Sequence, residues 1–251
     1  MPLLDSTPMR LSVVVPAYNE EERLEPMLRA YASALHAEDE LIVVVNGSTD
    51  HTADVARRVA LDHASIQVIE IPEKIGKGGA VRAGFARSTG ALVGFADADL
   101  ATPPGEFMRL VEATADADGA IASRWAPGAK VYGRTWLRTL ASRVFAGLVQ
   151  LMFGLPFSDT QCGAKVFQRR FLPTYLSTST VTDLAFDVEL LLILHRAGAR
   201  IVEVPSVWTA VPGSSTLASP IGLLRNGWRM FLSLLRLKRG ARRWVFAPVT
   251  R

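Results

Sequence analysis

The sequence contains a single cysteine, Cys162, so no disulfide can form within the chain. No apolar signal segment follows the first residues, MPLLDSTPMR, and both features favour an intracellular protein. No stretch reaches the roughly 20 unbroken apolar residues that a membrane-spanning helix needs. The mean hydropathy of +0.20 is nevertheless high for a freely soluble protein. We therefore expect a peripheral protein on the cytoplasmic face of a membrane.

The whole chain has a net charge of +4, and two of its long stretches contain no acidic residue. Residues 119–158 contain five basic residues and residues 204–251 contain eight, and neither stretch contains an acid. Both are rich in Leu, Phe, Met and Trp, which favours contact with an anionic partner over a solvated basic surface. We expect an anionic membrane surface and no nucleic acid, because stacking aromatics do not alternate with the arginines.

The order of the apolar runs predicts an α/β fold. A chain of 251 residues that is 49% hydrophobic suits one large domain. Short β-branched runs alternate with helical patterns, and we expect strands at residues 11–15, 41–45, 66–71, 92–96 and 120–123. This alternation is typical of a mostly parallel central sheet flanked by helices, a Rossmann-like nucleotide-binding half. Ligands bind such sheets outside the carboxyl ends of the strands.

The second half of the chain has a different pattern. We expect helices there at residues 136–153, 185–197 and 221–238 and a strand at 200–207, after the helix that we expect at residues 19–36 in the first half. We predict one domain over residues 1–220, with a donor half at about 10–118 and an acceptor half at about 119–220. A basic amphipathic extension at the membrane interface follows at 221–251.

Two aspartates follow the apolar run of residues 91–96 in the stretch FADADLATPP. Asp97 and Asp99 share one face of an extended strand, where two charged carboxylates would repel each other in an apolar interior. We expect them at the strand end, holding a divalent cation such as Mg²⁺ or Mn²⁺, which leaves positions open for phosphate oxygens. A turn with a helix-capping aspartate is the alternative.

The stretch KIGKGGAVRAG, residues 74–84, is rich in glycine, contains two lysines and leads into a helix. Glycines let the backbone approach an anion, which a helix N-terminus also favours. The stretch matches neither the P-loop nor the dinucleotide pattern. A plain turn before a helix explains it equally well.

Two rows of basic residues have helical spacing. Arg134, Arg138 and Ser142 are four residues apart, so they are predicted to stack along one side of the 135–153 helix and could hold a phosphate. At 100° per residue a second row falls within about 40° of one line, if the terminal helix continues through Gly240. Its members are Arg225, Arg229, Arg236, Arg239 and Arg243. Membrane docking and ordinary packing on the core both remain open for this helix.

Four motifs in order resemble the donor-site series of family 2 glycosyltransferases of GT-A fold: VVVPAYNEEERL, NGSTDHT, KIGKGGAVRAG and FADADLATPP. Three later motifs, SDTQCGAKVF, FDVELL and EVPSVW, resemble dolichyl-phosphate glucosyltransferases more than the mannose synthases. The resemblance extends over almost the whole chain. It implies inverting transfer of glucose from a UDP-sugar donor, UDP-glucose, to a polyprenyl-phosphate lipid acceptor.

The resemblance also implies roles for individual residues. The base and ribose would be held by Pro16, Ala17, Tyr18 and Glu20, and the same donor motifs include Asn46, Lys77 and Ala98. Asp97 would contact the nucleoside or the metal, and Asp99 would be the main metal ligand. The acceptor phosphate would be bound by Arg124, Arg134, Arg138 and Ser142. Asp99, Arg124 and Arg138 would then be the catalytic residues.

Four residues depart from the family pattern. Val45 and Asn46 stand where two aspartates are common, Ala101 replaces a polar residue, and Ser215 lies where a lysine often follows Gly-Ser. The departures at Val45, Asn46 and Ser215 leave open a non-catalytic, membrane-docked scaffold that binds sugar nucleotides. Transfer of mannose from GDP-mannose is a second alternative. A third alternative is transfer to a sugar hydroxyl, which needs a general base, for which three aspartates are available: Asp159, Asp183 and Asp187.

Overall fold

The computed structural model describes residues 10–211, 220–246 and 249, and the side chains of 227 onward within the last helix. The starting segment of residues 1–9, Ser215 and the side chain of Arg225 lie outside this description. The interpretations placed on them above therefore stay predictions.

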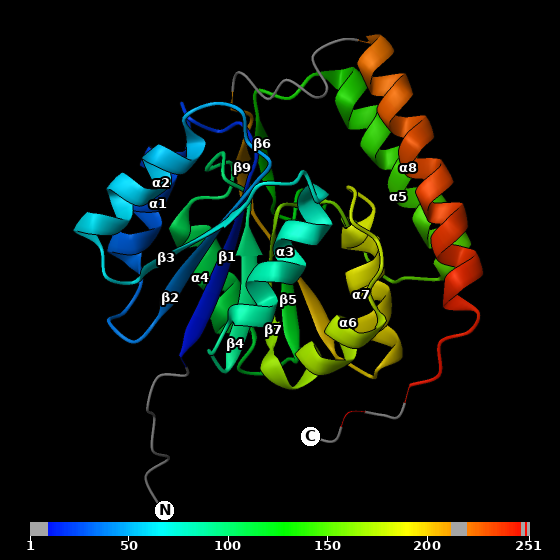
Figure 1. The fold of residues 1–251 in the computed structure, drawn as a ribbon. Helices are drawn as coiled ribbons and strands as arrows, with labels where there is room; N and C mark the ends of the chain where they lie inside the picture. Colours follow the sequence, from blue (N-terminus) through cyan, green and yellow to red (C-terminus); the bar gives the residue numbers. More distant parts are fainter. Residues whose placement is uncertain (1–9, 212–219, 247–248, 250–251) are drawn as a thin grey trace, which may run out of the picture.

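The chain folds around a seven-stranded sheet, drawn in Figure 1, with the strand order β3-β2-β1-β4-β7-β5-β8. Its strands are β1 (Leu11–Ala17), β2 (Glu40–Asn46), β3 (Ile66–Ile71), β4 (Leu92–Ala96), β5 (Gly119–Ser123), β7 (Ala164–Gln168) and β8 (Ile201–Pro205). All neighbours are parallel except β7, which runs antiparallel to both β4 and β5. The predicted α/β fold with a mostly parallel sheet is confirmed.

Helices cover both faces of the sheet because its central strands are apolar on both sides. One face packs against α1 (Leu24–Ala34), α2 (Thr52–Asp62) and α4 (Pro104–Ala113). The other packs against α3 (Gly76–Arg87), α6 (Leu172–Thr178) and α7 (Phe186–Arg196). Along β1, Val13 and Val15 face the first layer and Val14 the second, as the period of two in a strand requires.

Two further helices lie side by side at one edge of the molecule (Figure 1): α5 (Trp136–Phe153) and α8 (Pro220–Ala241). Both pack against α7 through one apolar cluster, to which Val149 contributes from α5 and Leu234 and Leu237 from α8. Among the helices that the structure describes, none is long and apolar enough to cross a membrane.

Several elements differ from the sequence-based expectation. The first helix begins at Leu24 rather than near Asn19, because Asn19 adopts a left-handed conformation (φ 53°) in a turn. The predicted strand at 200–207 divides into β8 and β9 (Val207–Thr209), and β9 pairs in parallel with β6 (Lys130–Tyr132). The last helix ends at Ala241, so Arg243 lies beyond it and does not extend the basic row.

The sequence patterns also missed β6, β7, α6 and the short 3-10 helix Arg169–Phe171. Strand β7 is the important omission, because it reads AKVFQ and its lysine, Lys165, is only 1% exposed. A buried lysine in a run of five residues breaks the alternation that identifies a strand.

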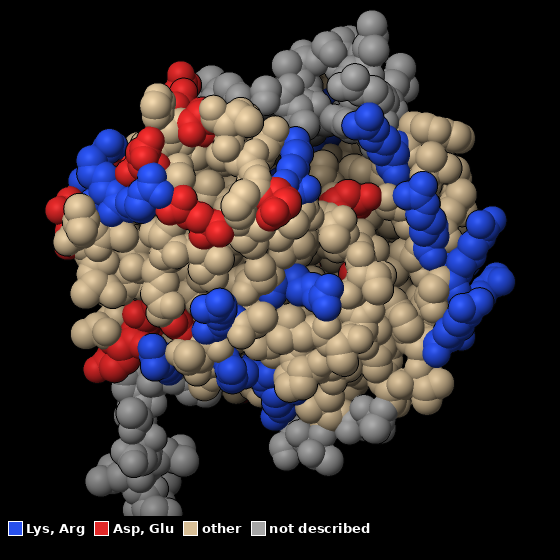
Figure 2. Space-filling model, viewed as in Figure 1, with Lys and Arg blue, Asp and Glu red and all other residues tan. Residues whose placement is uncertain are grey.

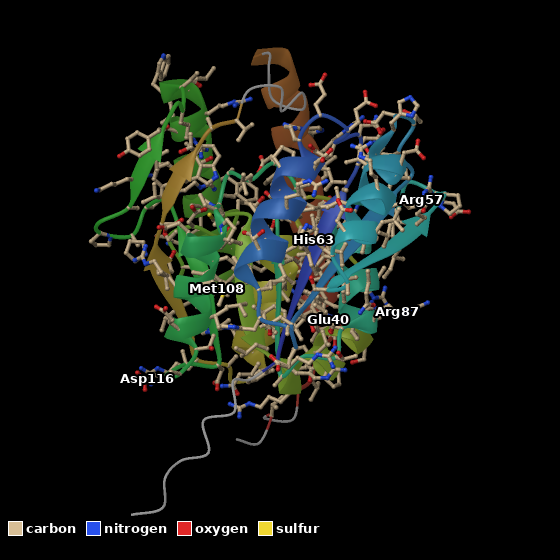
Figure 3. The ribbon with its side chains drawn as sticks, turned by 90° about the vertical axis from the view of Figure 1, so that its left-hand side faces the viewer. Glu40, Arg57, His63, Arg87, Met108 and Asp116 are labelled. Carbon is tan, nitrogen blue, oxygen red and sulfur yellow. The ribbon has the colours of Figure 1, made fainter. Side chains whose placement is uncertain are left out.

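The amino and carboxyl ends of the strands carry different kinds of residue. At the amino end, the buried carboxylate of Glu40 (labelled in Figure 3) accepts hydrogen bonds from Ser12 Oγ at 2.6 Å and from Thr89 N at 2.7 Å. These bonds tie β2 to β1 and to the loop before β4, so this end is structural. The glycines and charged residues of the predicted motifs gather at the opposite, carboxyl end.

Candidate active site

The loops that follow β1 and β2 interlock at the carboxyl end of the sheet. The backbone N–H of Asn19 donates to Ser48 Oγ at 3.1 Å, and that of Glu20 donates to Thr52 Oγ1 at 2.8 Å. The motifs VVVPAYNEEERL and NGSTDHT, which are about 30 residues apart, therefore form one wall of the site.

This wall also contains an exposed aromatic ring. Tyr18 is 37% exposed, and Lys74 Nζ lies 3.7 Å from its ring centroid. The amide of Asn46 donates to Ala17 O at 3.1 Å and so joins β2 to β1. Pro16, Ala17 and Ala98 are buried, so they shape the strand ends, while Tyr18 presents a surface for a base.

Asp97 and Asp99 follow the last residue of β4, at the strand end where the sequence predicts them. Asp97 Oδ1 lies 2.6 Å from Lys77 Nζ, at the start of α3. Asp99 Oδ1 accepts the backbone N–H of Ala101 at 3.0 Å. Burial, and then the charge of Asp97, raise the pKa of Asp99 above its usual range.

This end of the sheet concentrates negative charge. Burial raises the pKa of Glu20 to about 7 against the pull of Arg23, and the charges of Asp99 and Asp97 add to the rise. In the described part of the chain no group of three or more His, Cys, Asp or Glu side chains could hold a metal. Two hard oxygen donors in an excess of negative charge fit a divalent cation that takes its other ligands from a diphosphate.

The glycine-rich motif is explained in part by packing. A Cβ on Gly76, which has φ 75°, would lie 2.3 Å from Thr182 O, and one on Gly78 would lie 2.5 Å from Phe186 Cβ. The N–H of Gly78 donates to Thr182 O at 2.9 Å. These glycines let α3 start against the segment before α7, and this contact places Lys77 over Asp97.

A turn at Ser158–Gly163 connects α5 to β7 and enters the site because β7 is antiparallel. Its amino end therefore lies beside the carboxyl ends of β4 and β5, with Ala164 paired to Ala96. The N–H of Asp97 donates to Gly163 O at 3.0 Å. A Cβ on Gly163 would lie 2.0 Å from Asp97 Oδ2, so any larger residue here would displace this carboxylate.

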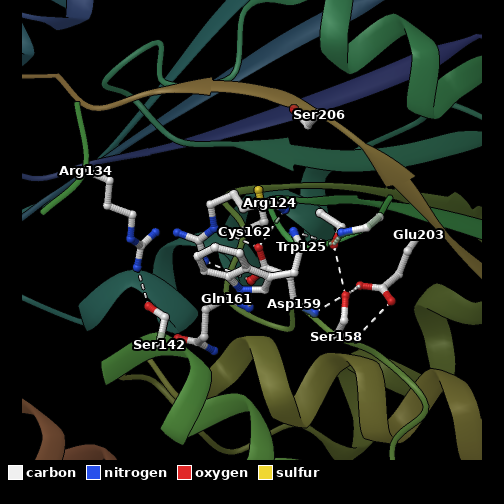
Figure 4. Close-up of polar contacts among 12 residues, drawn as sticks. Arg124, Trp125, Arg134, Ser142, Ser158, Asp159, Gln161, Cys162, Glu203 and Ser206 are labelled. Carbon is white, nitrogen blue, oxygen red and sulfur yellow. Dashed lines mark hydrogen bonds and ion pairs between the residues drawn. The ribbon is translucent and has the colours of Figure 1, made fainter. Parts of the chain in front are cut away.

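The other end of the turn holds Arg124, which follows β5 (Figure 4). Asp159 accepts from Arg124 Nε at 2.7 Å and from Nη2 at 2.8 Å, and only 2% of Asp159 is exposed. Glu203 of β8 accepts from the backbone N–H groups of Ser158 and Asp159 at 2.9 and 3.0 Å. The turn thus contacts Asp97 through a backbone hydrogen bond at Gly163, and it contacts Arg124 through the buried, charge-assisted hydrogen bonds of Asp159.

The structure gives a hydrogen-bond partner to each of the three aspartates that transfer to a sugar hydroxyl could use as a general base. Asp159 is paired with Arg124, and Asp187, 2% exposed, lies 2.5 Å from Lys165 Nζ. Asp183 accepts from Ala185 N and from Ser233 Oγ. Each carboxylate already has a structural partner. Glu189 is likewise structural, because it accepts the N–H groups of residues 180 and 181.

A cluster of arginines and tryptophans lies next to Arg124. The guanidinium carbon of Arg134 lies 5.3 Å from the Trp125 ring and 5.6 Å from the Trp208 ring. That of Arg143 lies 4.4 Å from the Trp125 ring. Burial, and then the neighbouring charge of Arg124, lower the pKa of Arg134 to about 10. An anion placed here would relieve this repulsion.

The predicted row on α5 forms in part. Arg134 precedes the helix and its guanidinium reaches Ser142 Oγ (Figure 4) and the carbonyl of Arg138. The backbone N–H of Arg138 donates to Oγ1 of Thr135, the N-cap residue of α5, at 3.4 Å. The sequence analysis missed Trp125, Trp208 and Arg143, although the tryptophans in the acid-free stretches were the available signal.

The sequence of this chain is similar to a known family and to named members of it. A profile of the family described as "Glycosyl transferase family 2" matches residues 12–176. The dolichyl-phosphate beta-glucosyltransferase of Drosophila melanogaster is 36% identical over 98% of this chain and 80% of its own length. The enzyme of that name from Homo sapiens is 36% identical over 84% of this chain and 70% of its own length.

Solved structures share the fold. Glucosyl-3-phosphoglycerate synthase from Mycobacterium tuberculosis, crystallised with Mn²⁺, UDP and glucosyl-3-phosphoglycerate, is 21% identical with a TM-score of 0.68. The alignment covers 94% of this chain and 81% of that one. A complex of the same synthase with Mg²⁺ and UDP has a TM-score of 0.65 at 20% identity, over 91% of this chain and 80% of that one.

Proposed function

This chain belongs to glycosyl transferase family 2, with a GT-A fold, and from that premise we propose that it transfers glucose from UDP-glucose to a polyprenyl phosphate. The acceptor would be a lipid of the dolichyl type, used at the cytoplasmic surface of a membrane. The observation that carries the proposal is the turn at 158–163, which contacts Asp97 of the carboxylate pair and Arg124 beside the arginine cluster. A nucleotide diphosphate would be held at the carboxylate pair through a divalent cation, and an acceptor phosphate fits the arginine cluster.

On the donor side, Asp97 and Asp99 would hold a divalent cation, Mg²⁺ or Mn²⁺. Such a cation neutralises the charge that develops on the departing diphosphate. Lys77, held over Asp97, adds a positive charge on the same side. Tyr18 and Lys74 offer a stacking surface and a cation at the end where the base would lie.

On the acceptor side, no general base is needed. A phosphate monoester is largely dianionic at neutral pH, since its second pKa lies near ~6. The work left to the protein is to align the phosphate oxygen with the anomeric carbon for attack from the opposite side of the leaving group. Arg134 and Ser142 offer donors for this phosphate, and Asp159 keeps Arg124 in one orientation.

A donor and acceptor panel tests the proposal. We expect glucose transfer from UDP-glucose to a short, water-soluble polyprenyl phosphate, with product of inverted configuration and a requirement for Mg²⁺ or Mn²⁺. A preference for GDP-mannose would replace the sugar assignment. Equal turnover with a sugar hydroxyl would overturn the acceptor assignment, and binding of UDP-glucose without any turnover would favour a scaffold.

The Arg134→Lys variant tests the acceptor phosphate site. A lysine keeps the positive charge but loses the planar fork that binds two phosphate oxygens. We expect the KM for the polyprenyl phosphate to rise about tenfold, a loss of one good charge-assisted hydrogen bond. The KM for UDP-glucose should stay unchanged. Arg57→Lys on the exposed surface of α2 is the matched control, and an equal rise in both KM values would contradict the assignment.

A further inference from the structure

Helix α5 carries an apolar stripe on its outer side. Trp136, Leu140, Val144 and Leu151 are 76%, 52%, 64% and 84% exposed. They are separated by four, four and seven residues, so they fall on one side of the helix. Helix α5 contains two charged residues, Arg138 and Arg143, and of these the exposed Arg143 lies at the border of the stripe, about 20° from the line of Trp136. Large apolar side chains rarely gather like this on a surface that stays in water.

The opposite side of α5 is already packed. Ala146 and Val149 are buried, and Phe145 and Leu148 pack against the cluster formed with α7 and α8. The helix is therefore apolar on both sides, and one side has no partner in the described residues. A helix with this pattern is expected to contact a second apolar medium or surface.

Next to the stripe, α8 presents a basic surface. Trp228 is 62% exposed, and Arg229, Arg236 and Arg239 have exposed side chains. No acidic residue occurs in residues 204–251. Figure 2 shows Lys and Arg side chains along the edge of the molecule where Figure 1 draws α8.

We propose that this face docks on the surface of an anionic bilayer. The docking face consists of the α5 stripe with Trp228 and the exposed arginines of α8. The stripe inserts among the acyl chains, and the arginines contact the anionic headgroups. The inference rests on the proposed function in one respect, because the lipid acceptor would be drawn from the same bilayer.

Charge complementarity selects the bilayer over a second copy of this chain. Two copies that met through this face would bring their arginine rows together, and like charges brought together at an interface are unfavourable. An anionic membrane attracts the same row, because its headgroups carry the opposite charge. The two exposed tryptophans also suit the boundary between headgroups and acyl chains.

Docking by α5 would also deliver the acceptor. The stripe begins at Trp136, two residues after Arg134, and the helix carries Ser142 in its second turn. A lipid in the bilayer under α5 would therefore have its phosphate near the start of this helix. The same helix contacts the membrane and positions the arginine that is proposed to bind the lipid phosphate.

Vesicle co-sedimentation of the full chain tests the docking face. The comparison uses vesicles of phosphatidylcholine alone and vesicles with 30 mol% phosphatidylglycerol, on the order of the anionic content that attracts basic surfaces. We expect at least tenfold tighter binding to the anionic vesicles. The combined variant Leu140→Ser, Val144→Ser, Leu151→Ser should bind them at least tenfold more weakly. Leu61→Ser, at an 88% exposed leucine of α2, should bind like the wild type.

A second variant separates charge from insertion. Arg229→Gln with Arg239→Gln should bring binding to the two vesicle types within about twofold of each other, because the anionic headgroups lose their partners. Unchanged vesicle binding by the serine variant would overturn the proposal. So would a wild-type dimer in analytical ultracentrifugation that the serine variant converts to a monomer, since the stripe would then join two copies.

Transfer to a water-soluble polyprenyl phosphate distinguishes docking from catalysis. The serine variant should retain this activity within about twofold, because its three substitutions lie outside the residues proposed to bind substrate, while its transfer to acceptor in vesicles falls at least tenfold. If the wild type binds vesicles as expected but transfers no sugar, the proposed function fails and the docking face stands. If the serine variant loses both activities equally, the stripe belongs to the site and the docking proposal fails.

Discussion

Asp99→Asn should lower the rate of sugar transfer about 10³-fold, the scale on which loss of a major electrostatic contact acts in an active site. The amide keeps the shape of the side chain and can still accept the N–H of Ala101, so the fold should be retained. What it loses is the negative charge that a divalent cation would require. The measurement is kcat for transfer from UDP-glucose, together with the affinity for Mn²⁺ by isothermal titration calorimetry.

The control for this variant is Asp116→Asn, at an exposed carboxylate labelled in Figure 3, which lies far from the carboxyl end of β4. It should match the wild type in rate and in Mn²⁺ affinity. If Asp99→Asn retains cation-dependent transfer at the wild-type rate, the metal role is wrong. A loss of rate with unchanged Mn²⁺ affinity would instead assign Asp99 to the sugar or the phosphate.

The donor half of the site could be predicted from sequence because its strands are regular. Parallel strands that are buried on both faces appear as nearly continuous apolar runs, and a charged pair directly after such a run marks the strand end. Asp97 and Asp99 lie where that pattern places them. The partner of Asp97 was harder to predict from the sequence, because Lys77 reaches Asp97 only when the glycines allow α3 to pack on the segment before α7.

The acceptor half could not be built in the same way. Its key strand, β7, contains a lysine that is buried only because Asp187, 22 residues later in α7, lies against it. Nothing local in AKVFQ signals that pairing. Without β7 the turn before it cannot be placed, and Asp159 then looks like a free carboxylate available as a base. The family resemblance singled out the turn, but only the antiparallel strand explains why it reaches Asp97 and Arg124 together.

Gly163→Ala should reduce kcat for transfer about 100-fold, because small displacements of reacting or binding groups cost on this scale. The added Cβ would lie 2.0 Å from Asp97 Oδ2 and 2.3 Å from Asp97 Cγ, so the carboxylate has to move. The backbone N–H of Asp97 is bonded to the carbonyl of Gly163, and the other carboxylate oxygen of Asp97 contacts Lys77. The displacement therefore separates the Asp97 carboxylate from Asp99 or from Lys77.

Gly105→Ala is the matched control for this substitution, because a Cβ at Gly105 in α4 has no atom within 4 Å. It should keep wild-type activity and gain a little stability, as alanine favours a helix over glycine. Affinity for Mn²⁺ should fall in Gly163→Ala and stay unchanged in Gly105→Ala. If both variants transfer glucose equally well, the turn does not hold Asp97. The proposed link between donor carboxylates and acceptor arginines would then fail, even if each side of the site is correctly assigned.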